Sequence, residues 1–280
     1  MINQKNIISF VINLDKYKDN YEIQIPYFNS INLTPKRFRA INAINDEHLQ
    51  YKNLINFISY YISPKSVIGC SLSHILLAQH LYSNYSTFKN IYFLILEDDV
   101  FPNENFTNNP KKFYHELNKE INNIKIMDKD WDIIQLHSDG LIDTKCTYST
   151  HPFTGSTAAY LISFNGLKKM SKEKATFHID FITQNFLKYR KYRSRQNFFY
   201  TNEKSSVNRD TQLSKSVSLK SFFLKRMIPL RGEKVWDDYL NFKTLRIPFL
   251  NKEFTANNLL DLFIIICIIY KIDLKNKLIK

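Results

Sequence analysis

Three consecutive carboxylates, Glu97, Asp98 and Asp99, are the residues of this 280-residue chain best suited to chemistry. They directly follow residues 91–96, an apolar run (IYFLIL) that predicts a buried strand. In open α/β sheets, ligands bind beyond the carboxyl ends of the strands, which is where these side chains are expected. Carboxylate oxygens suit Mn²⁺ or Mg²⁺, cations that bridge to phosphates and stabilise a departing nucleotide. A solvated acidic turn is the alternative, and the three residues alone do not decide.

Segments of strand length alternate with helical patterns over the first two thirds of the chain. Strands are expected at residues 7–14, 36–41, 91–96, 131–136 and 158–163. Helices are expected at residues 64–82, 111–126 and 165–172, the last with Asn165 as its cap. This alternation predicts an α/β domain with a largely parallel sheet.

The pattern becomes irregular from residue 188 onward. We expect a nucleotide-sugar-binding catalytic core at residues 1–185, and an acceptor-side, basic and apolar region at residues 186–280 packed on it. Within the second region, residues 229–248 are a candidate lid or acceptor-facing region. The apolar run at residues 262–270 is shorter than the ~20 residues of a spanning helix, so it predicts a core helix or one in a membrane interface.

The chain is strongly basic, with 39 Lys and Arg against 26 Asp and Glu and a net charge of +13. Such a charge favours nucleic acid, anionic lipid or phosphorylated glycans as partners. Neither a zinc-finger spacing nor an RNA-binding aromatic pair accompanies it, so nucleic acid is not expected. The basic run at residues 188–195 (KYRKYRSR) is interpreted as a solvated helix face or loop, or as a contact with an anionic membrane or acceptor.

The location of the protein is predicted from its cysteines and its first residues. Cys70, Cys146 and Cys267 form no pair of close spacing, which fits a reducing compartment. The apolar run at residues 7–12 is too short for a signal peptide. We therefore expect a cytoplasmic protein, either free in the cytoplasm or bound peripherally at the inner face of the membrane.

Five ordered blocks give a resemblance to a known family. They are residues 10–15 (FVINLD), 37–43 (RFRAINA), 68–74 (IGCSLSH), 96–100 (LEDDV) and 155–163 (GSTAAYLIS). Together they resemble glycosyltransferase family 25, which includes bacterial lipooligosaccharide β-galactosyltransferases and collagen galactosyltransferases. The likeness spans residues 7 to 180. The chain departs from the family where an arginine pair usually follows the first strand, near Asn20 and Tyr21, and where a glycine ends the second block, near Asn45.

The resemblance implies a fold of the GT-A type, with one Rossmann-like sheet, and an inverting transfer from UDP-galactose. The acceptor would be a glycan or glycolipid, lipooligosaccharide above all, and the cofactor Mn²⁺ or Mg²⁺. By position, Glu97 and Asp99 would be the metal and diphosphate ligands, and Asp98 would contact the ribose or sugar. Asn13 and Leu14 would line the nucleoside pocket at the end of the first strand.

Two further parts of the site are expected. Ser73 and His74 are predicted to open a helix whose N-terminal dipole favours phosphate, with capping or packing as the alternative role for His74. An inverting transfer also needs a general base for the acceptor hydroxyl. Asp180 and Asp139 are the candidates, and His178 with Asp180 could instead complete the metal shell.

Two other functions compete with the transferase. A non-catalytic protein that binds membranes or polyanions and keeps the fold would explain the charge, the basic run and the apolar terminus. A nucleotidyltransferase would share the acidic strand end, but such enzymes usually need a Gly-rich phosphate loop, which the chain lacks.

Overall fold

A computed structural model gives the fold of two compact units. The residues it describes are 6–85, 91–137, 147–148, 156–176, 178–185, 187–201, 243–247 and 252–255. The first unit comprises Met1–Asn56 and Lys65–Ser206, and the second comprises Phe57–Pro64 and Val207–Lys280.

The first unit contains a seven-stranded sheet in the order β2-β1-β3-β7-β5-β8-β6. Its strands are β1 (Ile7–Asn13), β2 (Lys36–Arg39), β3 (Tyr92–Glu97), β5 (Ile133–Gln135), β6 (Thr147–Tyr148), β7 (Ala159–Ile162) and β8 (Lys191–Arg193). The β1/β2, β1/β3 and β5/β8 pairs are parallel, whereas β7 and β6 run antiparallel to their neighbours. Five strands therefore point the same way, and their carboxyl ends share one edge. The predicted α/β class with a mostly parallel sheet is confirmed.

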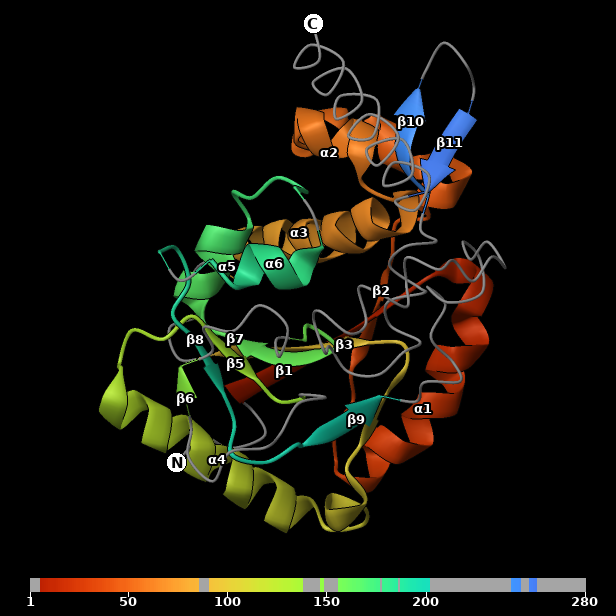
Figure 1. Cartoon of the computed structure of the whole chain (residues 1–280). Helices are drawn as coiled ribbons and strands as arrows, with labels where there is room; N and C mark the ends of the chain where they lie inside the picture. Colours follow the sequence, from red (N-terminus) through yellow and green to blue (C-terminus); the bar gives the residue numbers. More distant parts are fainter. Residues whose placement is uncertain are drawn as a thin grey trace, which may run out of the picture. The chain divides into compact units, whose positions relative to one another are not determined.

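Helices cover both faces of this sheet (Figure 1). α1 (Lys18–Ser30) and α4 (Pro110–Met127) pack with one face, and α3 (Lys65–Asn84), α5 (Phe164–Met170) and α6 (Ile179–Thr183) lie on the other. Short 3-10 helices are η2 (Asp15–Tyr17), η3 (Ala43–Asn45), η4 (Glu47–Leu54) and η5 (Glu104–Phe106). β4 (Val100–Pro102) pairs with β9 (Phe199–Thr201) in a separate two-stranded sheet.

The described part of the second unit contains α2 (Phe57–Ile62) and the antiparallel pair β10 (Lys243–Ile247) and β11 (Lys252–Thr255). The candidate lid at residues 229–248 is described only in β10, and the apolar run at residues 262–270 lies outside the described residues. None of the helices among the described residues has the length and apolar character needed to cross a membrane.

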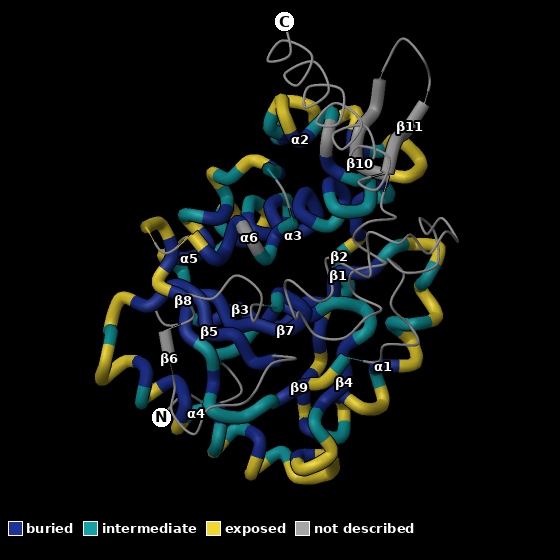
Figure 2. The backbone as a smooth tube through the Cα atoms, viewed as in Figure 1, coloured by how far each residue is buried: buried dark blue, intermediate teal, exposed yellow. Residues whose placement is uncertain are grey.

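The sheet is buried between its helix layers, as the dark strands of Figure 2 show. α4 contributes Phe113, Leu117, Ile121 and Ile124, whose spacing places them on one stripe of the helix. These four side chains are fully buried, and burial of such a side chain contributes roughly 1.5–3 kcal/mol. This packing fixes the strands whose ends carry the polar side chains of the site.

Two local predictions are wrong. α5 is capped by Ser163 and not by Asn165, because the chain leaves β7 at Ile162 and the extended Ser163 accepts a hydrogen bond from the Gly166 amide at 3.1 Å. The basic run at residues 188–195 is not a solvated helix face or loop throughout. It contains β8, which is held between β5 and β6, and it buries Lys191 to 1% exposure.

Candidate active site

The acidic turn follows β3 at the edge where the parallel strands end. Glu97 is the last residue of β3, and Asp98 and Asp99 form the turn into β4. Ile12 of β1 pairs with Glu97, which brings Asn13 next to Asp98. Asn13 Nδ2 donates to Asp98 Oδ2 at 2.8 Å, and the backbone amide of Leu14 also donates to that carboxylate. The structure thus brings together the residues predicted at the ends of β1 and β3.

Burial and mutual repulsion make this cluster of carboxylates unfavourable by itself. Burial, opposed by the Asn13 hydrogen bond and reinforced by the charge of Glu97, raises the pKa of Asp98 to about 6. Burial, together with the charges of Glu97 and Asp98, raises the pKa of Asp99 to about 8. Asp99 Oδ1 is also buried without a hydrogen-bond partner in the described part of the chain. A positive charge placed among these carboxylates would relieve both effects.

Ser73 and His74 lie in the interior of α3, which begins at Lys65, so the prediction that they open a helix is wrong. The apolar face of the helix extends upstream of them, and Ile68 is buried there. Ser73 Oγ donates to the Gly69 carbonyl at 2.7 Å and accepts from the Ile41 amide at 2.9 Å. Ser73 thereby joins α3 to the chain that follows β2, and it does not offer a phosphate site at a helix N-terminus.

His74 connects α3 to the acidic turn from within the core. Its side chain is 1% exposed, its Nδ1 lies 2.9 Å from the Tyr160 hydroxyl, and its Nε2 lies 3.4 Å from Glu97 Oε1. Thr157 Oγ1 lies at the same distance, 3.4 Å, from that carboxylate oxygen. Glu97 is therefore positioned by side chains of α3 and of the segment that enters β7.

Asp180 lies in the first turn of α6 (Ile179–Thr183), on the other side of Thr157. Its Oδ1 accepts from the Thr157 backbone amide at 2.7 Å and from the Thr157 hydroxyl at 2.8 Å. Its Oδ2 lies 3.1 Å from Nδ1 of His178. Burial raises the pKa of Asp180, but His178, the charge of Lys191 and the Thr157 hydrogen bond outweigh it and hold that pKa well below its usual value. Asp139, the other candidate base, lies outside the described residues.

His178 gains base strength from the same contact. Burial lowers its pKa, but the charge and hydrogen bond of Asp180 outweigh burial and raise the pKa above its usual value. An ionised carboxylate whose two oxygens are both engaged is a weak proton acceptor. An imidazole held through Nδ1 by such a carboxylate keeps its other nitrogen, Nε2, as the proton acceptor.

Comparisons with known proteins assign this arrangement to a family. A family model described as Glycosyltransferase family 25 (LPS biosynthesis protein) matches residues 6–183 of the 280. The chain belongs to glycosyltransferase family 25. No match was found among curated proteins. The expected family is therefore confirmed.

One solved structure with some similarity is the crystal structure of a glycosyltransferase involved in the glycosylation of the major capsid of PBCV-1. Its sequence identity is 12% and its TM-score is 0.31, and the match covers 64% of this chain and 65% of that one. The chain thus spans slightly less than two thirds of that protein, and a likeness of this size carries no argument about the site.

The acidic turn of this family 25 protein fits a divalent cation. Mn²⁺ and Mg²⁺ prefer carboxylate oxygens, and the turn offers the buried, unpartnered Asp99 Oδ1 beside Glu97. A second group, Cys70, His74 and Glu97, has ligand atoms within 4.8 Å of one another. Burial and the nearby carboxylates raise the pKa of Cys70 well above its usual value, so a neutral thiol is favoured over a metal-binding thiolate.

Sequence reasoning missed a basic group beside the nucleoside pocket predicted for this family 25 protein. Arg37 Nε donates to Asn13 Oδ1 at 2.6 Å, and Arg37 and Arg39 each form an ion pair with Asp15 at 2.6 Å. Hydrogen bonds from Arg37 and Arg39 lower the pKa of Asp15. The available signal was their spacing, because residues two apart on a strand point to the same side.

Proposed function

We propose that this glycosyltransferase moves galactose from UDP-galactose, with inversion, onto a hydroxyl of a glycan acceptor such as lipooligosaccharide. The observation that carries the proposal is the turn of three carboxylates, Glu97, Asp98 and Asp99, at the carboxyl edge of a mostly parallel sheet. A Rossmann-like sheet that ends in such a turn is the arrangement expected of a GT-A enzyme. Galactose and lipooligosaccharide are supported by the family resemblance alone.

The donor would lie across the ends of β1 and β3. Asn13 and Leu14 would line the nucleoside pocket, and Asp98, held by both, would contact the ribose or sugar. Glu97 and Asp99 would hold Mn²⁺ or Mg²⁺. When bound, that cation neutralises the diphosphate and so favours departure of the nucleotide. Arg37 keeps the Asn13 side chain oriented, since it occupies the amide oxygen while the amide nitrogen reaches Asp98.

The acceptor side needs a general base, and we assign this role to His178 with Asp180 as its positioning residue. In an inverting displacement the acceptor oxygen bonds to the anomeric carbon while the bond to the diphosphate oxygen breaks. The hydroxyl proton passes to His178 Nε2, and the nucleotide leaves with the electron pair of the broken bond. Asp180 holds the Nδ1 proton of His178 across 3.1 Å and stabilises the imidazolium that forms.

Replacement of one carboxylate tests the metal and donor site. Asp99→Asn keeps the shape of the side chain but removes its charge, and we expect transfer to fall by about 100-fold or more, as for loss of a group that stabilises the transition state. Asp19→Asn, which neutralises an exposed carboxylate on α1, is the matched control and should transfer normally. Full activity of Asp99→Asn would remove the basis of the metal assignment.

The same preparation tests the cofactor and the donor. Transfer should stop with EDTA and return with Mn²⁺ or Mg²⁺. A panel of UDP-sugars should show the highest kcat/KM with UDP-galactose. Metal-independent transfer would contradict the cation, and preference for another sugar would contradict galactose while leaving the transferase assignment in place.

A further inference from the structure

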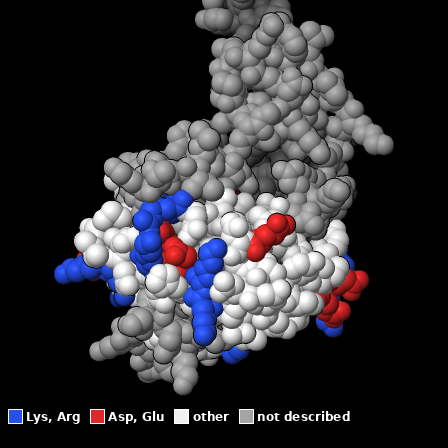
Figure 3. Space-filling model, turned by 90° about the horizontal axis from the view of Figure 1, so that it is seen from below, with Lys and Arg blue, Asp and Glu red and all other residues white. Residues whose placement is uncertain are grey.

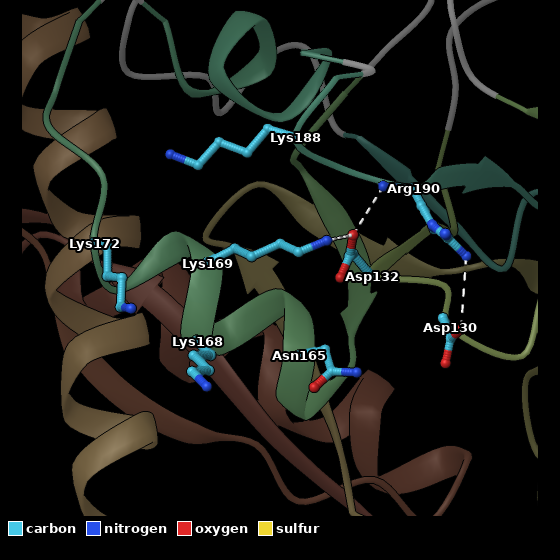
Figure 4. A pocket seen from close by; sticks show the side chains of 8 residues that line it. All are labelled: Asp130, Asp132, Asn165, Lys168, Lys169, Lys172, Lys188 and Arg190. Carbon is cyan, nitrogen blue, oxygen red and sulfur yellow. Dashed lines mark hydrogen bonds and ion pairs between the residues drawn. The ribbon is translucent and has the colours of Figure 1, made fainter.

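A second polar cavity lies outside the site described above. Its volume is about 450 Å³, within the range of small-molecule sites. It is lined by Asp130, Asp132, Asn165, Lys168, Lys169, Lys172, Lys188 and Arg190 (Figure 4). The segment before β5, helix α5 with the turn after it, and the segment before β8 provide these residues. Five of the eight are basic and two are acidic, so the cavity has an excess of positive charge.

This cavity lies at the edge of the sheet opposite the acidic turn. Ile133 and Phe93 both pair with Ile162 of β7, so they are level in the sheet. Asp132 is one residue before Ile133, whereas Glu97 is four residues beyond Phe93. Five residues of strand separate the two levels by roughly 16 Å at about 3.3 Å per residue. A group bound in the cavity would therefore not occupy the donor site.

Asp132 forms the buried base of the cavity. Its side chain is fully buried, and its Oδ2 accepts from Lys169 Nζ at 2.5 Å and from the Arg190 backbone amide at 2.8 Å. Its Oδ1 is buried and has no hydrogen-bond donor in the described part of the protein. In Figure 4 both dashed lines at Asp132 meet the same oxygen. A buried carboxylate oxygen without a donor is costly, and a ligand hydroxyl would satisfy it.

Helix α5 is held close to this carboxylate. A Cβ atom on Gly166 would lie 2.5 Å from the Asp132 carbonyl oxygen, so only glycine permits this approach of α5 to the chain before β5. Lys169 and Lys168 follow Gly166 on the same helix. The position of the basic side chains relative to Asp132 is therefore built into the backbone packing.

The basic side chains around the opening differ in how far they are neutralised. Lys188 forms an ion pair with Glu173 at 2.6 Å, and Arg190 pairs with Asp128 at 2.8 Å. Lys168 and Lys172 are exposed and have no ion pair within the described residues. Two ammonium groups are thus available to a bound anion beside an oxygen that needs a donor. More widely, Figure 3 shows basic side chains grouped next to acidic ones on the face it presents.

We propose that this cavity binds an acidic saccharide, with a sugar hydroxyl donating to Asp132 Oδ1 and a phosphate or carboxylate between Lys168 and Lys172. The ligand is a free sugar phosphate or an acidic unit of a glycan. The biological role of this cavity rests on the proposed function. An acidic unit of the acceptor bound here would hold the glycan at the edge of the sheet opposite the acidic turn.

Binding is tested on the full chain without donor. Isothermal titration with glucose 6-phosphate, glucose and inorganic phosphate separates the contribution of the hydroxyls from that of the anion. Glucose 6-phosphate should bind at least tenfold more tightly than either of the other two, and its affinity should fall as salt is added. Equal affinity for glucose and glucose 6-phosphate would overturn the anion contact. Equal affinity for inorganic phosphate would overturn the hydroxyl contact.

A double variant locates the site. Lys168→Ala/Lys172→Ala should weaken binding of glucose 6-phosphate by about tenfold or more, since two charge-assisted contacts are lost. Lys111→Ala/Lys119→Ala, two exposed lysines of α4, removes the same charge and should leave the affinity unchanged. If both double variants bind glucose 6-phosphate equally weakly, the effect comes from net charge alone, and the assignment of the anion contact to Lys168 and Lys172 is overturned.

Two further readouts complete the test. Phosphatidylglycerol vesicles that bind the wild type but not the Lys168/Lys172 variant, without any binding of glucose 6-phosphate, would replace the saccharide by a membrane contact and overturn the proposal. Donor hydrolysis should be unchanged in that variant. Failure of glucose 6-phosphate to bind can therefore be distinguished from failure of the transferase assignment.

Discussion

The replacement Asp180→Asn tests the base assignment most directly. The Asn oxygen can still accept from the Thr157 amide and hydroxyl, which lie 2.7 and 2.8 Å from Asp180 Oδ1. The Asn NH₂ group then takes the place of Asp180 Oδ2, which lies 3.1 Å from His178 Nδ1 in the wild type. Because the NH₂ group needs an acceptor, the imidazole proton moves to Nε2, and the nitrogen that must receive the acceptor proton is lost as a base.

The expected loss follows from the size of general-base catalysis. A positioned base contributes about 10²–10⁴ in rate, which is about 3–5.5 kcal/mol of barrier, so we expect kcat of Asp180→Asn to fall within that range. The KM for the donor should change little, because Asp180 does not contact the turn residues Asp98 and Asp99. The kcat of His178→Asn should fall by a similar factor, and the kcat of the double variant should be no lower than that of either single variant.

The pH profile gives an independent measurement. Protonated His178 cannot accept a proton, so wild-type kcat should fall as pH drops through the raised pKa of His178. That limb should be absent from His178→Asn. The base assignment is refuted if Asp180→Asn keeps kcat within threefold of wild type. It is also refuted if kcat of the double variant falls by the product of the fold-decreases measured for the two single variants. Thermal unfolding of each variant checks that the fold is retained.

Two further predictions concern stability. Gly69→Ala should lower the unfolding free energy by about 1–3 kcal/mol, although Ala usually stabilises a helix. The added Cβ would lie 2.7 Å from the Ile41 carbonyl oxygen, so α3 would have to move. An unchanged or higher Tm would contradict this packing. Burial, opposed by the charge of Asp180, lowers the pKa of Lys191 to about 8. Between that pH and the unfolded pKa of about 10.4 the unfolded chain binds more protons, so stability should rise with pH by up to about 3 kcal/mol. Urea unfolding at several pH values should show this rise in wild type and not in Lys191→Met, and parallel curves would refute it.

Segments with a strong local pattern were predicted well. The run at residues 91–96 corresponds to β3, and the helix expected at residues 111–126 corresponds to α4. Both follow from periodicity, which is a local property of the chain. The direction of β7, antiparallel to β3 and β5, was not predicted because it depends on how the chain returns to the sheet. The sequence of β7 would suit a buried strand of either direction.

The site was predicted as far as strand ends could indicate it. Asn13 and Asp98 lie at the ends of neighbouring parallel strands, and a hydrogen bond joins their side chains. Ser73 was misjudged because serine is a common N-cap residue, whereas α3 already begins at Lys65, directly after Ser63 and Pro64. Lys191 was taken for a surface residue because lysine is almost never fully buried. A hydrogen bond to the Thr183 hydroxyl of α6 and the charge of Asp180 help to compensate for its burial.

The proposed function requires a basic protein to bring an anionic donor to an acidic turn. Burial and the repulsion among Glu97, Asp98 and Asp99 already raise the pKa values of Asp98 and Asp99, so a diphosphate brought to this turn alone would meet further repulsion. The net charge of +13 attracts anions over a distance, but it cannot offset three carboxylates in direct contact with a phosphate. A divalent cation between turn and diphosphate removes both repulsions at once. Under the proposed function, productive donor binding would therefore depend on the metal, so the EDTA experiment tests donor binding as well as the cofactor.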